Sequence, residues 1–214
     1  MKTKKLSELT HFGKATITAF IGDVATGKSN AIVQTVSMNP ETVVIFLSAD
    51  LFSDYIRNDD VTIDVESSMD KDALVRCLSA PMTTKGSRIF MNISENADVL
   101  TVVTEIMKQH SNIEYILVFN RNYQDDSSLV EYVTGLYNSR ILFETQYISA
   151  VDQEILCKAD RVLFKTPNAI IKLLHGNSDI EKTRAKLKCG EALYISEGHE
   201  ICKVCFENVH NTGK

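Results

Sequence analysis

The feature that most constrains the fold of this chain is the glycine-rich stretch GDVATGKS at residues 22–29. The four fixed positions of the pattern G-x-x-x-x-G-K-[ST] are filled by Gly22, Gly27, Lys28 and Ser29. Residues 14–21 alternate and are rich in β-branched side chains, which predicts a strand. Residues 30–38 predict a short helix that stops before Pro40. A strand, a glycine loop and a helix in this order predict a phosphate-binding loop.

The residue types in this loop suit phosphate chemistry. Gly22 and Gly27 let the backbone turn tightly and aim its N–H groups at a phosphate, near the positive end of the helix dipole. We expect Lys28 to reach the β- and γ-phosphates of a nucleotide, and Ser29 to ligate Mg²⁺. The predicted nucleotide-binding residues are Gly22, Asp23, Val24, Ala25, Thr26, Gly27, Lys28, Ser29 and Asn30.

The composition is that of a globular protein. The chain has 214 residues, of which 44% are hydrophobic and 24% charged, and this is enough for one α/β domain. No apolar run reaches membrane-spanning length, and the five cysteines are scattered, so we expect a cytoplasmic protein with reduced thiols and no membrane segment. A net charge of −5 argues against a surface coated with basic residues. It does not exclude a ring whose pore carries a few lysines.

Strands and helices are expected to alternate along the rest of the chain. The expected strands are residues 41–50, 87–93, 113–119, 139–146 and 160–166, and the expected helices are residues 72–79, 97–110, 128–138, 151–159, 167–176 and 179–188. Residues 51–71 and 80–86 are expected to be loops. This order predicts a single α/β domain over residues 1–214, with a mostly parallel sheet. Residues 1–13 are expected to be an N-terminal extension, and residues 190–209 a C-terminal antiparallel β-hairpin.

The ends of the expected strands carry polar residues, where parallel sheets hold their ligands. One such end is Thr145-Gln146, followed by a short helix and a strand near Ala159-Asp160. This layout resembles the FtsK–HerA superfamily of P-loop ATPases, which includes the DNA-packaging ATPases of membrane-containing viruses. The order of elements is similar over nearly the whole chain. The resemblance implies a three-layer RecA-like fold, ATP with Mg²⁺ as cofactors (GTP being the alternative), and γ-phosphate sensing by Thr145 and Gln146.

The chain departs from that superfamily at the end of the third strand, its Walker B position. There the superfamily has Asp-Glu, of which the Asp holds Mg²⁺ through water and the Glu activates the attacking water. Here the residues are Asn120 and Arg121. Asn120 can still hold a metal-bound water, whereas an arginine cannot act as a base at neutral pH. The usual arginine-finger position is occupied by Gly135 and Leu136.

Two acidic residues are candidates for the missing carboxylate. Asp50, at the end of the second expected strand, resembles the catalytic base of RecA-like recombinases and hexameric helicases, with Gln146 as the counterpart of their sensor glutamine. The alternative for Asp50, weighted equally, is a helix N-cap. Glu144 is the second candidate, although alternation along its strand points it away from Thr145.

The resemblance implies an ATP-driven, ring-forming motor that translocates or packages DNA. The expected DNA contacts are Lys85, Arg88 or the stretch Lys182–Lys188, with a solvated basic face as the alternative for that stretch. Arg121 and Arg140 are candidate arginine fingers, and for Arg140 a surface ion pair is favoured. Two other functions stay open. The Asn-Arg pair favours a non-hydrolysing assembly or regulatory subunit, whereas the lack of an arginine-rich lid disfavours a small-molecule kinase.

The cysteines suggest packing more than metal binding. Cys202 and Cys205 have the spacing C-x-x-C, but an alternating strand places them on opposite faces. Cys77 and Cys157 lie in apolar helical patterns and are expected in the core.

Overall fold

The computed structural model describes residues 3–9, 12, 16–23, 25–93, 98–120, 138–145, 159–165, 178–196 and 201–207. These residues fall into two compact units. The first unit takes the described residues up to 35 and those from 142 onward. The second takes the described residues from 36 to 141. Strand β7 contributes residues to both units, and each unit is described separately below.

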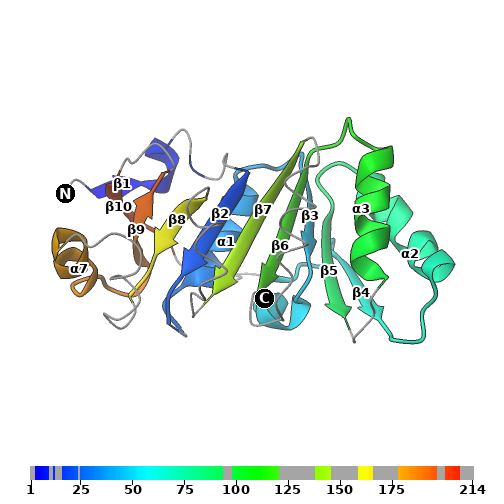
Figure 1. The fold of residues 1–214 in the computed structure, drawn as a ribbon, viewed down its shortest axis with the longest axis horizontal. Helices are drawn as coiled ribbons and strands as arrows, with labels where there is room; N and C mark the ends of the chain where they lie inside the picture. The colour runs from blue at the N-terminus through cyan, green and yellow to red at the C-terminus, as the bar shows by residue number, and fades with distance from the viewer. Residues whose placement is uncertain are drawn as a thin grey trace. The chain divides into compact units, whose positions relative to one another are not determined.

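The sheet of the first unit contains the strand that leads into the glycine loop. Its strands are β1 (Thr3–Lys5), β2 (Ile17–Ile21), the later residues of β7 (Ser139–Thr145), β8 (Asp160–Leu163), β9 (Glu191–Ile195) and β10 (Ile201–Cys205). Their order is β1-β10-β9-β8-β2-β7. Strand β2 pairs in parallel with β8, and β9 pairs antiparallel with both β8 and β10 (Figure 1). The helices are η1 (Leu6–Glu8), most of α1 (Lys28–Ser37) and α7 (Ser178–Arg184).

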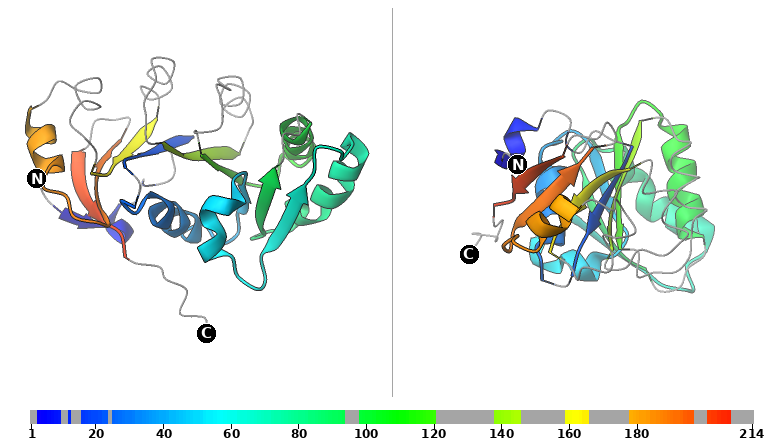
Figure 2. Two further views of the ribbon diagram at one scale, coloured as in Figure 1. Left: turned by 90° about the horizontal axis from the view of Figure 1, so that it is seen from below. Right: turned by 60° about the vertical axis from the view of Figure 1, so that its left-hand side comes forward.

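The second unit is a parallel sheet with helices beside it. Its strands are β3 (Val43–Phe46), β4 (Val61–Val65), β5 (Arg88–Ile93), β6 (Tyr115–Asn120) and the first residues of β7. Their order is β7-β6-β3-β5-β4, and β3 pairs in parallel with both β5 and β6. The helices are η2 (Ala49–Tyr55), α2 (Lys71–Thr83) and α3 (Val99–Gln109). Helices α2 and α3 lie side by side, and α2 packs on β4 and β5 (Figure 2).

Apolar side chains explain why these segments form central strands. All four residues of β3 are buried, as expected for a parallel strand that is covered on both faces. Phe46 of β3 stacks on Phe90 of β5, with ring centroids 4.3 Å apart and ring planes 3° apart. Such pairs add about 1 kcal/mol of stability beyond the area that they bury.

The pairing of the strands confirms the predicted α/β fold with a mostly parallel sheet and a C-terminal antiparallel hairpin.

Two expectations about local structure were wrong. Residues 51–71 were predicted to be a loop, but they contain β4. This strand is the last in its sheet, and its side chains are alternately exposed and more buried, so it lacks the continuous apolar run of a central strand. Helix α2 continues through Pro81, since Leu74, Leu78 and Met82 maintain one buried face across the proline. Within the expected N-terminal extension, Thr3–Lys5 form β1, which pairs in parallel with β10. The predicted helices 128–138, 151–159 and 167–176 lie outside the described residues, apart from Asn138 and Ala159, which are not helical.

Tyr115 provides a test of the core of the second unit. Its hydroxyl donates a hydrogen bond to the Met82 carbonyl oxygen at 3.1 Å, and burial raises the pKa of Tyr115 from 10.0 to about 12. The stability that comes from the neutral phenol is therefore complete below pH 10 and is lost as the pH rises toward 12, by at most about 1.4 kcal/mol per pH unit. We expect Tyr115→Phe to cost about 1 kcal/mol at neutral pH and to remove this alkaline loss.

Urea unfolding at pH 7 and between pH 10 and pH 12 measures both effects. Tyr55→Phe is the matched control, because it leaves Tyr115 in place and should keep the alkaline loss. An unchanged pH dependence in Tyr115→Phe would show that Tyr115 ionises normally.

Among the described residues, no helix has both the length and the apolar character needed to cross a membrane.

Candidate functional site

The glycine loop follows β2 directly and is fixed by backbone hydrogen bonds on both sides. The Gly22 N–H donates to the Thr145 carbonyl oxygen at the end of β7, at 3.1 Å. The Asp23 N–H donates to the Lys165 carbonyl oxygen just after β8, at 3.3 Å. Helix α1 then begins at Lys28. The loop therefore joins a strand to the N-terminus of a helix, and its start is held between the two neighbouring strands.

Two glycines of the loop are required by the space around them. A Cβ at Gly22 would lie 2.6 Å from Phe164 Cβ and 3.0 Å from Thr26 Oγ1, which is too close for any side chain. Gly27 has a φ of +98°, a conformation that side chains with a Cβ rarely adopt. Close packing and backbone conformation thus explain the two glycines of the motif.

Lys28 places its ammonium group inside the loop. Its Nζ donates to the Asp23 carbonyl oxygen at 2.8 Å, and the residue is buried. Burial lowers the pKa of Lys28, and the nearby carboxylates of Glu144 and Asp23 partly oppose this shift. A buried cation with only one described hydrogen-bond acceptor is suited to take phosphate oxygens as further partners.

Ser29 pairs with a carboxylate that is distant in sequence. Its hydroxyl Oγ donates to Glu144 Oε2 on β7 at 3.0 Å. Glu144 is buried, with 5% of its surface exposed, and so is Thr145, whose backbone accepts the bond from Gly22. Glu144 therefore contacts Ser29 through its side chain, whereas Thr145 contacts the loop through its backbone. A hydroxyl beside a carboxylate is a pair of hard oxygen donors, which fits Mg²⁺.

The first turns of α1 are tied to the segment after β10. Asn30 Nδ2 donates to the Glu207 carbonyl oxygen at 2.7 Å, and Gln34 Nε2 donates to the same oxygen. The Glu207 N–H donates back to Gln34 Oε1 at 3.3 Å. Asn30, which was predicted to bind the nucleotide, therefore uses its side chain to anchor the helix.

The other candidate carboxylate and amide lie in the second unit. Strand β3 ends at Phe46, and Asp50 follows in the first turn of η2, where it is exposed. Asp50 is therefore not the end of a strand, and the N-cap of η2 is Ser48. Asn120 ends β6 as predicted and is buried. Val24, Arg121 and Gln146 lie outside the described residues, as do Gly135 and Leu136.

Some basic residues proposed for DNA contact or for an arginine finger have structural partners instead. Arg88 is largely buried: its Nη2 donates to the Tyr55 carbonyl oxygen at 3.0 Å and lies 3.5 Å from an Asp60 carboxylate oxygen. Arg140 Nη2 lies 2.6 Å from a Glu114 carboxylate oxygen, which confirms the ion pair, although the guanidinium is buried and not at the surface. These contacts argue against DNA binding by Arg88.

The basic stretch near the C-terminus is only partly solvated. Arg184 is buried and its Nε donates to the Phe164 carbonyl oxygen at 3.0 Å, so this residue belongs neither to a solvated basic face nor to a nucleic-acid contact. Lys182, Lys186 and Lys188 are exposed, and so is Lys85 of the second unit. These four lysines remain the candidates for contact with a nucleic acid backbone.

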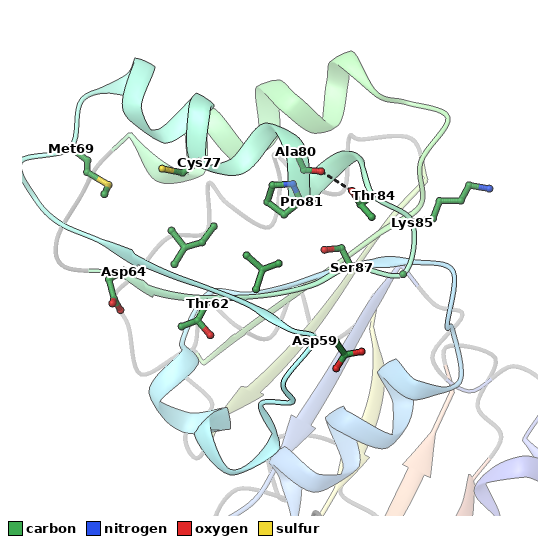
Figure 3. A pocket seen from close by; sticks show the side chains of 13 residues that line it. Asp59, Thr62, Asp64, Met69, Cys77, Ala80, Pro81, Thr84, Lys85 and Ser87 are labelled. Atoms are coloured by element: carbon green, nitrogen blue, oxygen red, sulfur yellow. Dashed lines mark hydrogen bonds between the residues drawn. The ribbon is translucent and has the colours of Figure 1, made fainter. Parts of the chain in front are cut away.

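The second unit contains an open hollow of about 800 Å³ between β4 and α2. Figure 3 shows Cys77 and Pro81 on the α2 side and Thr62 and Asp64 on β4. No residue of the glycine loop lines it. Cys77 is exposed, so its predicted place in the core was wrong: it lines this open hollow, whereas Leu74 and Leu78 of the same helix are buried.

The C-x-x-C pair behaves as the strand pattern predicts. Cys202 is buried and Cys205 is exposed, so the two lie on opposite faces of β10. Within the described ranges, no group of three or more His, Cys, Asp or Glu residues is arranged to hold a metal ion. Cys157 lies outside those ranges.

The sheet order, the loop and the C-terminal antiparallel strands together define the fold of a P-loop NTPase. The chain is similar to solved structures of the genome packaging NTPase B204 from Sulfolobus turreted icosahedral virus 2. For its complex with AMPPCP the TM-score is 0.62 at 12% identity, covering 88% of this chain and 96% of that chain. For its complex with sulfate the TM-score is 0.63 at 13% identity, covering 92% and 98%. No protein-family model matches the chain, and a search of curated proteins found no match.

Proposed function

We propose that this chain is a P-loop ATPase that binds ATP with Mg²⁺ and works in a ring-forming motor that packages or translocates DNA. The observation that carries the proposal is the loop between β2 and α1. In this loop the Lys28 Nζ lies 2.8 Å from the Asp23 carbonyl oxygen, and Ser29 lies in the first turn of the helix. The packaging role is supported by the similarity of fold to a viral genome packaging NTPase that was crystallised with AMPPCP and with ATP-gammaS.

Different residues of the loop would contact the phosphates and the metal. The N–H groups at the start of α1 can donate to the phosphate oxygens, and the positive end of the helix dipole favours the negative charge there. Lys28 exchanges its bond to the Asp23 carbonyl oxygen for bonds to phosphate oxygens, and the nearby Glu144 carboxylate helps to keep the ammonium charged. The Ser29 hydroxyl, in the first turn of α1, is an oxygen donor on the metal side. When bound, Mg²⁺ neutralises charge on the β- and γ-phosphates.

A second function is a nucleotide-binding assembly or regulatory subunit that does not hydrolyse ATP. Two observations favour it: Asn120 replaces the acidic residue at the end of β6, and Asp50 lies exposed in η2 four residues beyond β3. Neither residue offers a buried carboxylate to activate water.

Steady-state ATP hydrolysis, measured with and without double-stranded DNA, distinguishes the two functions. The protein's mass in solution with ATP is measured in parallel. The motor predicts turnover by an oligomer that DNA stimulates. Tight binding of ATP without turnover would favour the second function, and no binding of ATP would contradict both.

A further inference from the structure

The motor needs a carboxylate at its metal site, and the Walker B position of the sequence does not provide one. In a P-loop site the hydroxyl of the last motif residue ligates Mg²⁺, and an acidic residue beside it holds the metal's water. The residue beside that hydroxyl here is Glu144, whose Oε2 lies 3.0 Å from Ser29 Oγ. Glu144 comes from β7, the neighbour of β2 in the first unit, whereas Asn120 ends β6.

We propose that Glu144 supplies the carboxylate of the magnesium site, in place of the acidic residue missing from the end of β6. This inference rests on the proposed function, because it assumes that the loop binds a Mg²⁺-nucleotide. It assigns to one residue of β7 a role for which the sequence favoured Asp50 and Asn120.

Burial is the first argument for this role. Every residue of β7 is buried, and Glu144 has 5% of its surface exposed. A carboxylate in such a place costs free energy unless polar groups or cations compensate for it. The described compensation comes from the Ser29 hydroxyl and from the charge of Lys28. Both are residues of the phosphate-binding motif, so part of the stabilisation of Glu144 comes from the place where a cation would bind.

The register of β7 is the second argument. The Thr145 carbonyl oxygen accepts from the Gly22 N–H, so the end of β7 is fixed against the start of the loop. Because side chains alternate along a strand, a fixed backbone position at Thr145 also fixes the direction of the Glu144 side chain. The backbone register thus sets the side of β7 from which Glu144 contacts Ser29.

The chemistry of the pair is the third argument. A carboxylate oxygen accepts hydrogen bonds, so the Ser29 hydroxyl is the donor of the hydrogen bond to Glu144. That leaves lone pairs of the hydroxyl oxygen available for a metal, and the carboxylate adds a full negative charge beside it. A neutral amide such as that of Asn120 cannot add this charge.

The test measures how much Mg²⁺ strengthens the binding of a fluorescent, non-hydrolysable ATP analogue. Dissociation constants are measured in excess Mg²⁺ and in excess EDTA for the wild-type protein and for Glu144→Gln. The ratio of the dissociation constant in EDTA to that in Mg²⁺ measures how much Mg²⁺ strengthens binding. We expect Glu144→Gln to lower this ratio about 10-fold, the size of effect that follows the loss of a group supporting a metal ligand. In EDTA it should bind at least as well as the wild-type protein, because a negative charge near the phosphates is gone. Glu41→Gln, at an exposed glutamate, is the matched control.

Two results would overturn the inference. One is an unchanged Mg²⁺ dependence in Glu144→Gln, and the other is an equal loss of affinity with and without Mg²⁺, which would make Glu144 a structural support of Ser29. Glu144→Asp, which keeps the charge, should retain more of the Mg²⁺ effect than Glu144→Gln and provides the test if the amide variant does not fold. Failure of the proposed function looks different, because the wild-type protein itself would then bind no analogue under either condition.

Discussion

Lys28→Ala is expected to weaken ATP binding about 100-fold. The ammonium group is buried in the loop and donates to the Asp23 carbonyl oxygen at 2.8 Å, so it is already held where phosphate oxygens are expected. Hydrogen bonds between charged groups are worth about 3 kcal/mol at most, which corresponds to about 100-fold in affinity. Titration of the purified variant with a fluorescent ATP analogue measures the effect.

The same variant should not unfold the protein. Burial lowers the pKa of Lys28, so the protonated lysine disfavours the folded state without ligand at neutral pH. This cost disappears as the pH rises from the lowered pKa toward 10.5, and it is absent from Lys28→Ala at every pH. We therefore expect the melting temperature without nucleotide to stay close to that of the wild type. Lys71→Ala, at an exposed lysine of α2, is the control and should bind ATP normally. Normal ATP binding by Lys28→Ala would contradict the assigned site.

Gly22→Ala is expected to produce the second large effect. Its Cβ would lie 2.6 Å from Phe164 Cβ, so either the loop or the backbone after β8 must move. Overpacking of this kind costs about 2 kcal/mol of folding free energy. The Gly22 N–H also donates a hydrogen bond to the Thr145 carbonyl oxygen, so movement of the loop should also displace the end of β7. We therefore expect the ATP affinity to fall about 10-fold.

Gly86→Ala is a matched control for this effect. A Cβ at Gly86 would lie 2.6 Å from the Pro40 carbonyl oxygen, as close a contact as at Gly22, and the φ of +73° at Gly86 adds backbone strain. Gly86 and Pro40 both lie in the second unit. Gly86→Ala should therefore lower stability at least as much as Gly22→Ala and leave the ATP affinity of the folded protein unchanged. Equal losses of affinity in both variants would mean that the effect of Gly22→Ala comes from general instability.

The central strands and the loop could be predicted because their signals are local. The apolar run at β3 and the strand, glycine loop and helix around Gly22 each occupy a short window of sequence. Strand β4 was missed because it lies at the end of its sheet and keeps Thr62 and Asp64 exposed, so its apolar signal is weak. Helix α2 was predicted to end at Ser79, whereas it continues through Pro81 because the packing of Met82 outweighs the loss of one backbone hydrogen bond.

The metal side of the site could be predicted only in part, with Glu144 as the second candidate, because the contact between Ser29 and Glu144 depends on a long-range register. Ser29 and Glu144 are 115 residues apart, and their contact requires that β7 end beside the loop at a fixed residue. A charged residue within the apolar strand ILFETQ was the signal available in the sequence. Asp50 was preferred because its segment was expected to remain a strand up to that residue, whereas β3 ends at Phe46 and the chain turns into η2.

The most direct test of the central claim is a calorimetric titration of the purified wild-type protein with ATP, once in Mg²⁺ and once in EDTA. We expect one ATP bound per chain, more tightly in Mg²⁺, with the affinity lowered about 100-fold in Lys28→Ala. A folded wild-type protein that binds no ATP under either condition would contradict it.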